Sequence, residues 1–340
     1  MRRKSIHGAV GMRDVARRAG VGAITVSRVL SGAANVSEET RARVLEAAKQ
    51  LGYVRNHLAR DFASSRTPLV GVIVPTVANL MFADKIEALA EVLHPHGYQL
   101  LVAHNAYSLE TELKQVEAFV AQRVSGIVLT GMIHDPGVRT LLERSGIPTI
   151  ETWNLSEESI DMAVGFSNAA AAEAMVEHLA QRGYRHIALV HPHLEANDRA
   201  VDRLEGYRAA MKRLCLPWRP ELERASAFGF ANGARALIGL LDHVKPLDAI
   251  FFGNDALAAG ALLECRRRRI RVPQDLAIAG FDDVDLAQQL DPPLTTVRVP
   301  MRDIGHQAGQ LLLRRFAGEE TGPVTLDLGF EIIERQSTIM

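Results

Sequence analysis

The stretch RDVARRAGVGAITVSRVLSGAANVSEETRARVLEAAKQLGYVRN, residues 13–56, contains three short patterns of helical periodicity separated by tight turns. Apolar residues recur every three or four positions over residues 12–19, and Gly20 supplies the left-handed conformation that commonly ends a helix. A second pattern follows over residues 23–31, after a turn of only a few residues. Two short helices joined this closely predict a helix-turn-helix, whose second helix can lie in the major groove of DNA.

A third helix is expected to complete this small domain, which we place over residues 1–55. Ser37 is a good N-cap for it, and the apolar periodicity continues through Val44. In the following segment, residues 56–67, apolar residues lie four apart, but the segment is too short to be stable as an isolated helix. We therefore expect a hinge helix that becomes ordered only when DNA and a partner subunit supply contacts.

Charge is unevenly distributed along the 340 residues. Residues 1–66 carry 13 Lys and Arg against 5 Asp and Glu, whereas the remaining residues carry 26 against 35. Neutralisation of DNA phosphates depends on local charge. The basic amino-terminal part and the acidic remainder therefore predict that only the amino-terminal part binds DNA. A solvated basic surface is the alternative.

Composition predicts a globular protein of two or three domains, since 47% of the residues are hydrophobic. No signal-peptide or membrane-spanning stretch follows the start of the chain, so we expect a cytoplasmic protein without a membrane partner. Cys215 and Cys265 lack the spacing of metal ligands or of a disulfide framework. No metal and no cofactor are therefore expected.

From Leu69 onward, apolar strand patterns alternate with helical stretches. LVGVIVP, YQLLVAH, SGIVLTG and PTIETW form a first set, and RHIALVH, LDAIFFGN and DLAIAGFDD repeat the design after about residue 167. The alternation predicts two doubly wound α/β lobes with parallel sheets. Ligands of such sheets bind beyond the carboxyl ends of the strands, so the loops there are where a site is expected.

Matching residues at fixed spacing run through the amino-terminal pattern: Asp14-Val15-Ala16, Ala19-Gly20-Val21, Thr25-Val26-Ser27-Arg28-Val29, Val36-Ser37, Thr40-Arg41, Val44, Leu51-Gly52-Tyr53 and Asn56. Together they resemble the DNA-binding domain of the lactose-repressor family. The phrases MFADKIEAL, LVAHNAY, DMAVGFSN, AIAGFDD and LDLGFEI look most like gluconate-operon repressors of that family. The resemblance covers about residues 12–335. It implies a sequence-specific transcriptional regulator whose effector is a sugar or sugar acid.

The resemblance also implies an effector domain of the periplasmic-binding-protein type over residues 68–340, with three crossovers between its lobes. We expect the first lobe over about 68–166 and 297–322, and the second over about 167–296 and 323–340. The helix from Met301 to Phe316 would then return to the first lobe. A homodimer is expected, binding a pseudo-palindromic operator.

The predicted DNA contacts are Ala23, Ile24, Thr25, Ser27, Arg28, Ser31, Asn35, Asn56 and Phe62. Arg28 can donate two hydrogen bonds to a guanine edge, whereas Ala23 and Ile24 offer apolar contact suited to thymine methyl groups. Phe62 stands where family members usually carry a leucine that wedges into the minor groove from paired hinge helices. The alternative for Phe62 is packing within the protein.

The predicted effector contacts are Asn79, Phe82, His134, Glu151, Trp153, Arg199, Arg203, Asn254 and Asp282. By resemblance, Arg203, Asn254 and Asp282 touch the effector, and such side chains suit neighbouring sugar hydroxyls. Trp153 occupies a place where many relatives have aspartate, so we expect that sugar contact to be either missing or replaced by stacking. Asp255 is expected to cap the next helix rather than to bind ligand.

Arg199 and Arg203 lie four residues apart, so they can share one helix face and present two cations to a carboxylate. The alternative pairs them with Asp198 and Asp202 on the surface. Both interpretations remain open at this point. A neutral sugar or a corepressor is the alternative to a sugar-acid effector that releases the operator.

Two other classes of protein are disfavoured. The sequence does not support an enzyme, because it contains no phosphate loop, no Gly-x-Ser-x-Gly elbow and no Gly-x-Gly-x-x-Gly after a strand. We therefore assign no catalytic residues. An exported sugar carrier would begin with a signal segment and would not need a basic amino-terminal domain.

Overall fold

The computed structural model describes residues 10–30, 33, 35–53, 66–156, 158–319 and 322–339. The chain divides into two compact units, Met1–Thr67 and Pro68–Met340. The predicted hinge helix falls almost wholly on residues 54–65, which lie outside the described part of the chain. No helix among the described residues is both long enough and apolar enough to cross a membrane.

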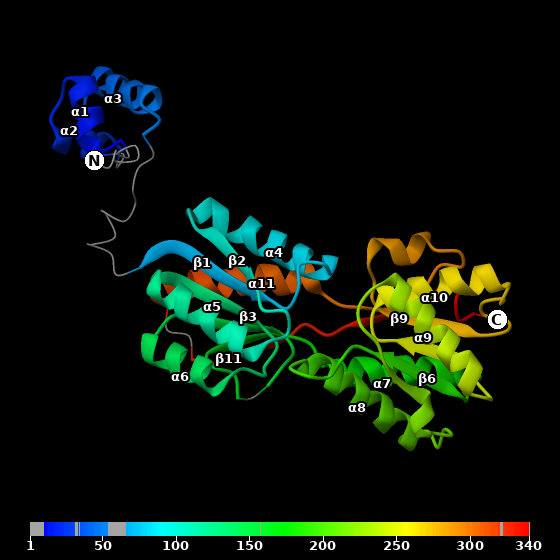
Figure 1. Cartoon of the computed structure of the whole chain (residues 1–340). Helices are drawn as coiled ribbons and strands as arrows, with labels where there is room; N and C mark the ends of the chain where they lie inside the picture. Colours follow the sequence, from blue (N-terminus) through cyan, green and yellow to red (C-terminus); the bar gives the residue numbers. More distant parts are fainter. Residues whose placement is uncertain are drawn as a thin grey trace, which may run out of the picture. The chain divides into compact units, whose positions relative to one another are not determined.

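The amino-terminal unit contains three helices, α1 (Met12–Ala19), α2 (Ala23–Leu30) and α3 (Glu38–Gln50), drawn in blue in Figure 1. Gly20 ends α1 with a φ of 65°, and the Ser37 hydroxyl caps α3 by accepting from the Thr40 amide at 3.3 Å. One small core joins all three helices. Its buried side chains are Val15, Val26, Val29, Val44 and four alanines. The predicted helix-turn-helix with a supporting third helix is confirmed.

The first lobe of the larger unit is built on a six-stranded sheet of order β11-β5-β4-β3-β1-β2. Its strands are β1 (Thr67–Val74), β2 (Gln99–His104), β3 (Val124–Thr130), β4 (Thr149–Trp153), β5 (Met162–Gly165) and β11 (Val324–Asp327). The pairs β1–β2, β3–β4, β4–β5 and β5–β11 are parallel. Parallel pairing brings the carboxyl ends of these strands to one edge, as expected.

Helices cover both faces of this sheet, as Figure 1 shows. On one face α4 (Leu80–Leu93) packs against α11 (Met301–Phe316), and on the other lie α5 (Leu109–Ala121) and α6 (Pro136–Ser145). Alternate side chains of β1 point to opposite faces of the sheet. Val72 belongs to the core under α4, and Ile73 belongs to the core under α5. Gly305 permits the close approach of α11, because a Cβ there would lie 2.4 Å from the Lys85 carbonyl oxygen.

The second lobe repeats the design with the strand order β12-β10-β9-β8-β6-β7. These strands are β6 (Ile187–His191), β7 (Glu223–Ala225), β8 (Ala249–Phe252), β9 (Ala277–Asp282), β10 (Thr295–Arg298) and β12 (Glu331–Ile333). Only β12 runs antiparallel to its neighbour among the pairs described. The helices are α7 (Asn168–Gln181), α8 (Asp198–Arg213), α9 (Phe230–His243) and α10 (Asp255–Arg268).

The chain passes between the lobes three times, but two crossovers differ from the expected positions. All of β10, to Arg298, belongs to the second sheet, so the second crossover follows residue 298 rather than 296. Residues 324–327 form β11 in the first sheet, so the third crossover lies after Asp327 and not near residue 322. The physical reason is that β11 completes the parallel edge beside β5, which a break at residue 322 would leave open.

Candidate DNA-reading helix and effector pocket

Helix α2 buries one side and exposes the other, as a groove-reading helix requires. Val26 and Val29 are buried, whereas Arg28 is exposed and Ile24 is 71% exposed. The Ile24 side chain is therefore accessible from outside the domain. Among the other predicted contacts, Ala23 and Asn35 are exposed, Thr25 and Ser27 are half-buried, and Ser31, Asn56 and Phe62 lie outside the described residues.

The larger unit contains a cavity of about 460 Å³ between its two lobes. It is lined by Asn79, Phe82, Ala106, Tyr107, Trp153, Pro192, His193, Glu195, Asn197, Arg199, Arg203, Ser226, Ala227, Phe228, Gly253, Asn254 and Asp282. These residues lie at or after the carboxyl ends of β1, β2, β4, β6, β7, β8 and β9, so both sheets contribute to the cavity. Seven of the predicted effector contacts lie together here: Asn79, Phe82, Trp153, Arg199, Arg203, Asn254 and Asp282.

Two asparagines of the pocket also begin helices. The Asn79 side chain accepts from the Met81 amide at 3.2 Å at the start of α4, and Asn254 accepts from the Leu257 amide at 2.9 Å at the start of α10. The prediction that Asp255 is the cap of α10 is therefore wrong, because the residue before it already fills that position. Both amide groups keep their Nδ2 donors available for a ligand.

Asp255 instead lies buried behind the pocket, where it accepts from the Thr296 hydroxyl at 2.6 Å and from the Val284 amide at 3.0 Å. Burial raises its pKa to about 7, against the opposing effect of these hydrogen bonds. Burial and then the neighbouring Asp255 also raise the pKa of Asp282 well above the usual range, while Arg203 opposes this. Asp282, at a φ of 122°, thus brings a carboxyl group to the pocket that is poised to exchange hydrogen bonds with hydroxyl groups.

The two arginines of α8 are held differently. Arg199 Nη1 lies 2.8 Å from Asp198 Oδ1 and donates to the Thr130 carbonyl at 3.3 Å, so the pairing with Asp198 exists but is buried, not superficial. Arg203 Nη1 donates to Asn168 Oδ1 at 2.9 Å, and its guanidinium lies 4.6 Å from the centre of the Phe281 ring. Arg203 does not pair with Asp202. Its buried Nε has no partner within the described structure.

Burial lowers the pKa of Arg203 to about 10, with Asp282 as the principal opposing charge. The guanidinium therefore remains cationic at neutral pH although it is only 6% exposed. The expectation that Arg199 and Arg203 present two cations to a carboxylate is thus modified. Arg199 already has a carboxylate partner, and Arg203 is the cation available to an anion.

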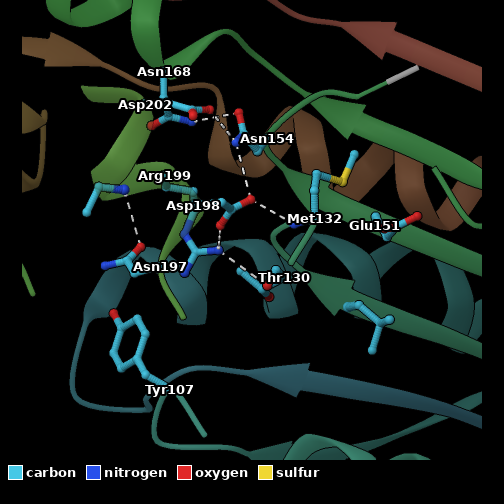
Figure 2. A network of polar contacts seen from close by, with 12 residues as sticks. Tyr107, Thr130, Met132, Glu151, Asn154, Asn168, Asn197, Asp198, Arg199 and Asp202 are labelled. Carbon is cyan, nitrogen blue, oxygen red and sulfur yellow. Dashed lines mark hydrogen bonds and ion pairs between the residues drawn. The ribbon is translucent and has the colours of Figure 1, made fainter. Parts of the chain in front are cut away.

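A polar network that joins the lobes was not foreseen from the sequence (Figure 2). Asp198 Oδ2, on α8 of the second lobe, accepts from the Met132 amide at 2.7 Å and from Asn154 Nδ2 at 3.2 Å. The same Asn154 nitrogen donates to Asp202 Oδ2 at 2.6 Å. Met132 and Asn154 follow β3 and β4 of the first lobe, so these contacts form an interlobe latch, defined here as Asn154, Asp198, Asp202 and the Met132 amide.

Gly131 makes room for the latch. Its φ is 91°, and a Cβ at this position would lie 2.3 Å from Arg199 Nη1 and 2.7 Å from Asp198 Oδ1. A side chain would therefore both strain the backbone and displace the interlobe contacts. Asn154 follows a strand end and Asp198 adjoins Arg199, and these positions were the only signals in the sequence.

His134 and Glu151, both predicted to contact effector, are absent from the pocket lining. His134 Nδ1 lies 2.6 Å from Glu112 Oε1, and Nε2 lies 3.3 Å from Glu151 Oε1, outside hydrogen-bond geometry. Glu112 is on α5, so this buried triad lies under the α5 face of the sheet and not at the cleft. Alternation along β4 is the reason, because Glu151 points to α5 while Thr152 reaches Lys85 on α4.

Replacing His134 by glutamine is expected to lower the free energy of unfolding by about 3 kcal/mol, because two buried carboxylates lose their cation. Burial alone would lower the pKa of His134, but Glu112 and Glu151 outweigh it and raise the pKa to about 9. The stabilisation should thus be complete below the unfolded pKa of about 6.5 and disappear as the pH rises through 9. Thermal unfolding at several pH values measures this, with exposed His96→Gln as the control. Equal melting of His134→Gln and wild type near neutral pH would contradict it.

Lys85 is a further buried cation that sequence reasoning missed. Its Nζ donates to Thr130 Oγ1 at 2.9 Å and to Thr152 Oγ1 at 2.8 Å, and it lies 5.8 Å from the centre of the Phe82 ring. Burial, followed by the nearby Arg199 charge, lowers its pKa to about 7. A lysine in the middle of an amphipathic helix pattern gave no signal that it would face inward.

Comparison with known proteins agrees with this geometry. Residues 11–56 match the model of bacterial regulatory proteins of the lacI family, and residues 176–338 match a periplasmic binding protein-like domain. The HTH-type transcriptional regulator GntR of Pseudomonas aeruginosa is 39% identical, over 96% of this chain and 95% of that protein.

Solved structures show the same likeness over the whole chain. A LacI-family transcriptional regulator from Silicibacter pomeroyi is 31% identical, with a TM-score of 0.90 over 97% of this chain and 100% of that one. The lac repressor dimer bound to operator and the anti-inducer ONPF is 27% identical, with a TM-score of 0.82 over 98% and 100%. The chain belongs to the lacI family of bacterial regulatory proteins. It is a DNA-binding transcriptional regulator with a two-lobed effector domain, and that family is made up of regulators, not enzymes.

Proposed function

We propose that this regulator represses genes of sugar-acid catabolism and that a gluconate-type sugar acid is the effector that releases it from its operator. The observation that carries the proposal is Arg203, a buried pocket cation with no carboxylate within ion-pair distance among the described residues and with an unpartnered Nε. A buried charge without an ion-pair partner is costly, so a carboxylate ligand at this position gains more than a neutral one. The resemblance to gluconate-operon repressors supports the same class of ligand.

The remaining pocket groups suit the hydroxyl groups of such a ligand. Asn79, Asn254 and Asp282 offer donors and acceptors from both lobes. Phe82 and Trp153, whose ring centres lie 4.9 Å apart, offer an apolar surface for the C–H groups of the carbon chain. A cavity of about 460 Å³ accommodates a six-carbon acid.

On the DNA side, a homodimer would place two copies of α2 on the half-sites of a pseudo-palindromic operator. The proposed base contacts are Arg28, Ile24 and Ala23, whose exposure supports the assignment. Asn35, Thr25 and Ser27 are proposed to assist them. Leu80 and Leu286, which are 70% and 41% exposed beside a second hollow of the larger unit, are apolar surfaces suited to burial between subunits.

The effector pocket and the interlobe latch share helix α8, which suggests how binding is transmitted. Arg199 and Arg203 line the pocket, while Asp198 and Asp202 of the same helix accept from Asn154 of the first lobe. We propose that a ligand held by Arg203 alters the approach of the lobes and thereby the separation of the two DNA-binding domains. A regulator of this kind acts on the chromosome, so we place it in the cytoplasm.

A ligand screen tests the proposal. Thermal shift with D-gluconate, related sugar acids and the matching neutral sugars should show stabilisation by an acid, since a ligand that binds only the folded protein raises the melting temperature. Selection from a randomised duplex library should then yield a pseudo-palindromic site. Stabilisation by neutral sugars alone would contradict the sugar-acid assignment, and conversion of the bound ligand to product would contradict a regulator.

A further inference from the structure

Trp153 breaks the alternation of its strand. Along β4, Thr152 faces α4 and Glu151 faces the triad beneath α5, so simple alternation would also direct residue 153 toward α5. The backbone of Trp153 instead adopts a φ of 87°, and its ring lies against Phe82 of α4 in the effector pocket. A left-handed conformation is rare for a bulky residue and costs about 1–3 kcal/mol, and such strain concentrates at ligand sites.

The indole N–H of Trp153 has no partner. The side chain is only 3% exposed, and its Nε1 neither donates to a protein group nor reaches solvent in the described structure. Two pocket-lining side chains have buried polar atoms in this condition, and the other is Arg203, through Nε. Indole and guanidinium nitrogens are donors only, so both lack an acceptor rather than a donor.

A sugar hydroxyl can accept from these atoms, but it is a neutral acceptor that also brings a proton of its own. The nearby carboxylates on α8 are already engaged, because Asp198 accepts from Met132 and Asp202 accepts from Asn154. A carboxylate ligand, in contrast, is an acceptor with two oxygens, and hydrogen bonds to an ionised acceptor are about twice as strong as neutral ones. Among ligand groups, a carboxylate is therefore the one that satisfies the two unpartnered donors best.

We propose that the indole N–H of Trp153 donates to the carboxylate of the effector and that Trp153 sets the preference of this pocket for acids over neutral sugars. The inference rests on the proposed sugar-acid effector and adds the residue that discriminates it. Arg203 attracts the anion, while Trp153 fixes the position of one carboxylate oxygen. A strand-end donor without charge achieves this without adding another cation beside Lys85 and Arg199.

Trp153→Phe provides the first test, because it removes the N–H and keeps a ring against Phe82. By isothermal titration calorimetry, D-gluconate should bind the variant about 10- to 100-fold more weakly than wild type. Any weak binding of D-glucose should not change. Trp153→Asp, which places a carboxylate opposite the ligand's own, should abolish D-gluconate binding. The matched control is Trp218→Phe, since Trp218 is the only other tryptophan and is 46% exposed at the surface.

A second measurement does not depend on the folding of the Trp153 variants. The Trp218→Phe protein retains one indole, so its ¹H–¹⁵N spectrum should contain one indole resonance, from Trp153. D-gluconate should move this resonance downfield as the hydrogen bond forms, and D-glucose should not. An unmoved resonance in the presence of bound D-gluconate, or undiminished affinity in Trp153→Phe, would overturn the role of Trp153 and leave the proposed function standing. Failure of wild type to bind any sugar acid would remove both.

Discussion

Arg203→Ala is expected to weaken effector binding at least about 100-fold while leaving operator affinity unchanged. The guanidinium supplies charge-assisted hydrogen bonds to the ligand, each worth about 1.5–3 kcal/mol, and the substitution removes all of them. It also removes the contact with Asn168 and the stacking on Phe281, both within the second lobe. None of these contacts involves the DNA-binding unit, so the variant should become a regulator that does not respond to effector.

The controls for this prediction lie on the same helix. Arg213→Ala removes an arginine that pairs with Glu173 and Glu177 at the surface, and it should bind effector as wild type does. Arg203→Lys keeps a cation but loses the planar fork, and an intermediate affinity is expected. Calorimetry and fluorescence anisotropy with labelled operator measure the two affinities. Wild-type affinity of Arg203→Ala for every sugar acid would show that the pocket cation has no part in recognition.

Arg28→Ala is expected to remove most of the sequence preference of the DNA-binding unit. A bidentate contact with guanine discriminates by about 1–3 kcal/mol, which is about 10- to 100-fold at each half-site. Non-specific affinity should fall much less, because it depends on the many phosphate contacts of the basic unit. Titrating the selected site and a scrambled duplex at several salt concentrations separates the two effects.

Arg28→Lys is the informative companion, since it retains the charge and shortens the reach. It should keep the salt dependence of wild type and lose part of the preference for the selected site. Ser37→Ala would serve as a stability control, because it removes the cap of α3 without altering α2. A full specificity ratio in Arg28→Ala would mean that other residues read the operator.

Local patterns were sufficient to predict the elements and much of the pocket. Helical periodicity located α1, α2 and α3 because Val15, Val26 and Val44 mark their buried sides. Strand-end motifs located Asn254 and Asp282 because parallel strands in one sheet end at one edge. These predictions needed only spacing and the rule for open α/β sheets, together with the family resemblance.

The sequence did not predict to which face of the sheet a side chain near a strand end would point. His134 follows β3 and Glu151 belongs to β4, yet both side chains turn to α5, where Glu112 completes a buried triad. Trp153 enters the pocket only through its left-handed backbone, which no periodicity signals. The latch through Asn154 likewise depends on the approach of two lobes that are distant in sequence.

The edge of the first sheet is a similar case. Residues 324–327 alternate apolar and polar side chains, as a strand does, but their place beside β5 of the first lobe follows from long-range pairing that no local pattern specifies. That pairing determines where the final crossover lies.

The most direct test of the account is a thermodynamic cycle on the wild-type protein, measuring the operator affinity with and without D-gluconate and the D-gluconate affinity with and without operator. The account predicts that the effector weakens operator binding and that operator weakens effector binding by the same factor, of about 5- to 150-fold. Operator affinity that stays the same at saturating effector would contradict it.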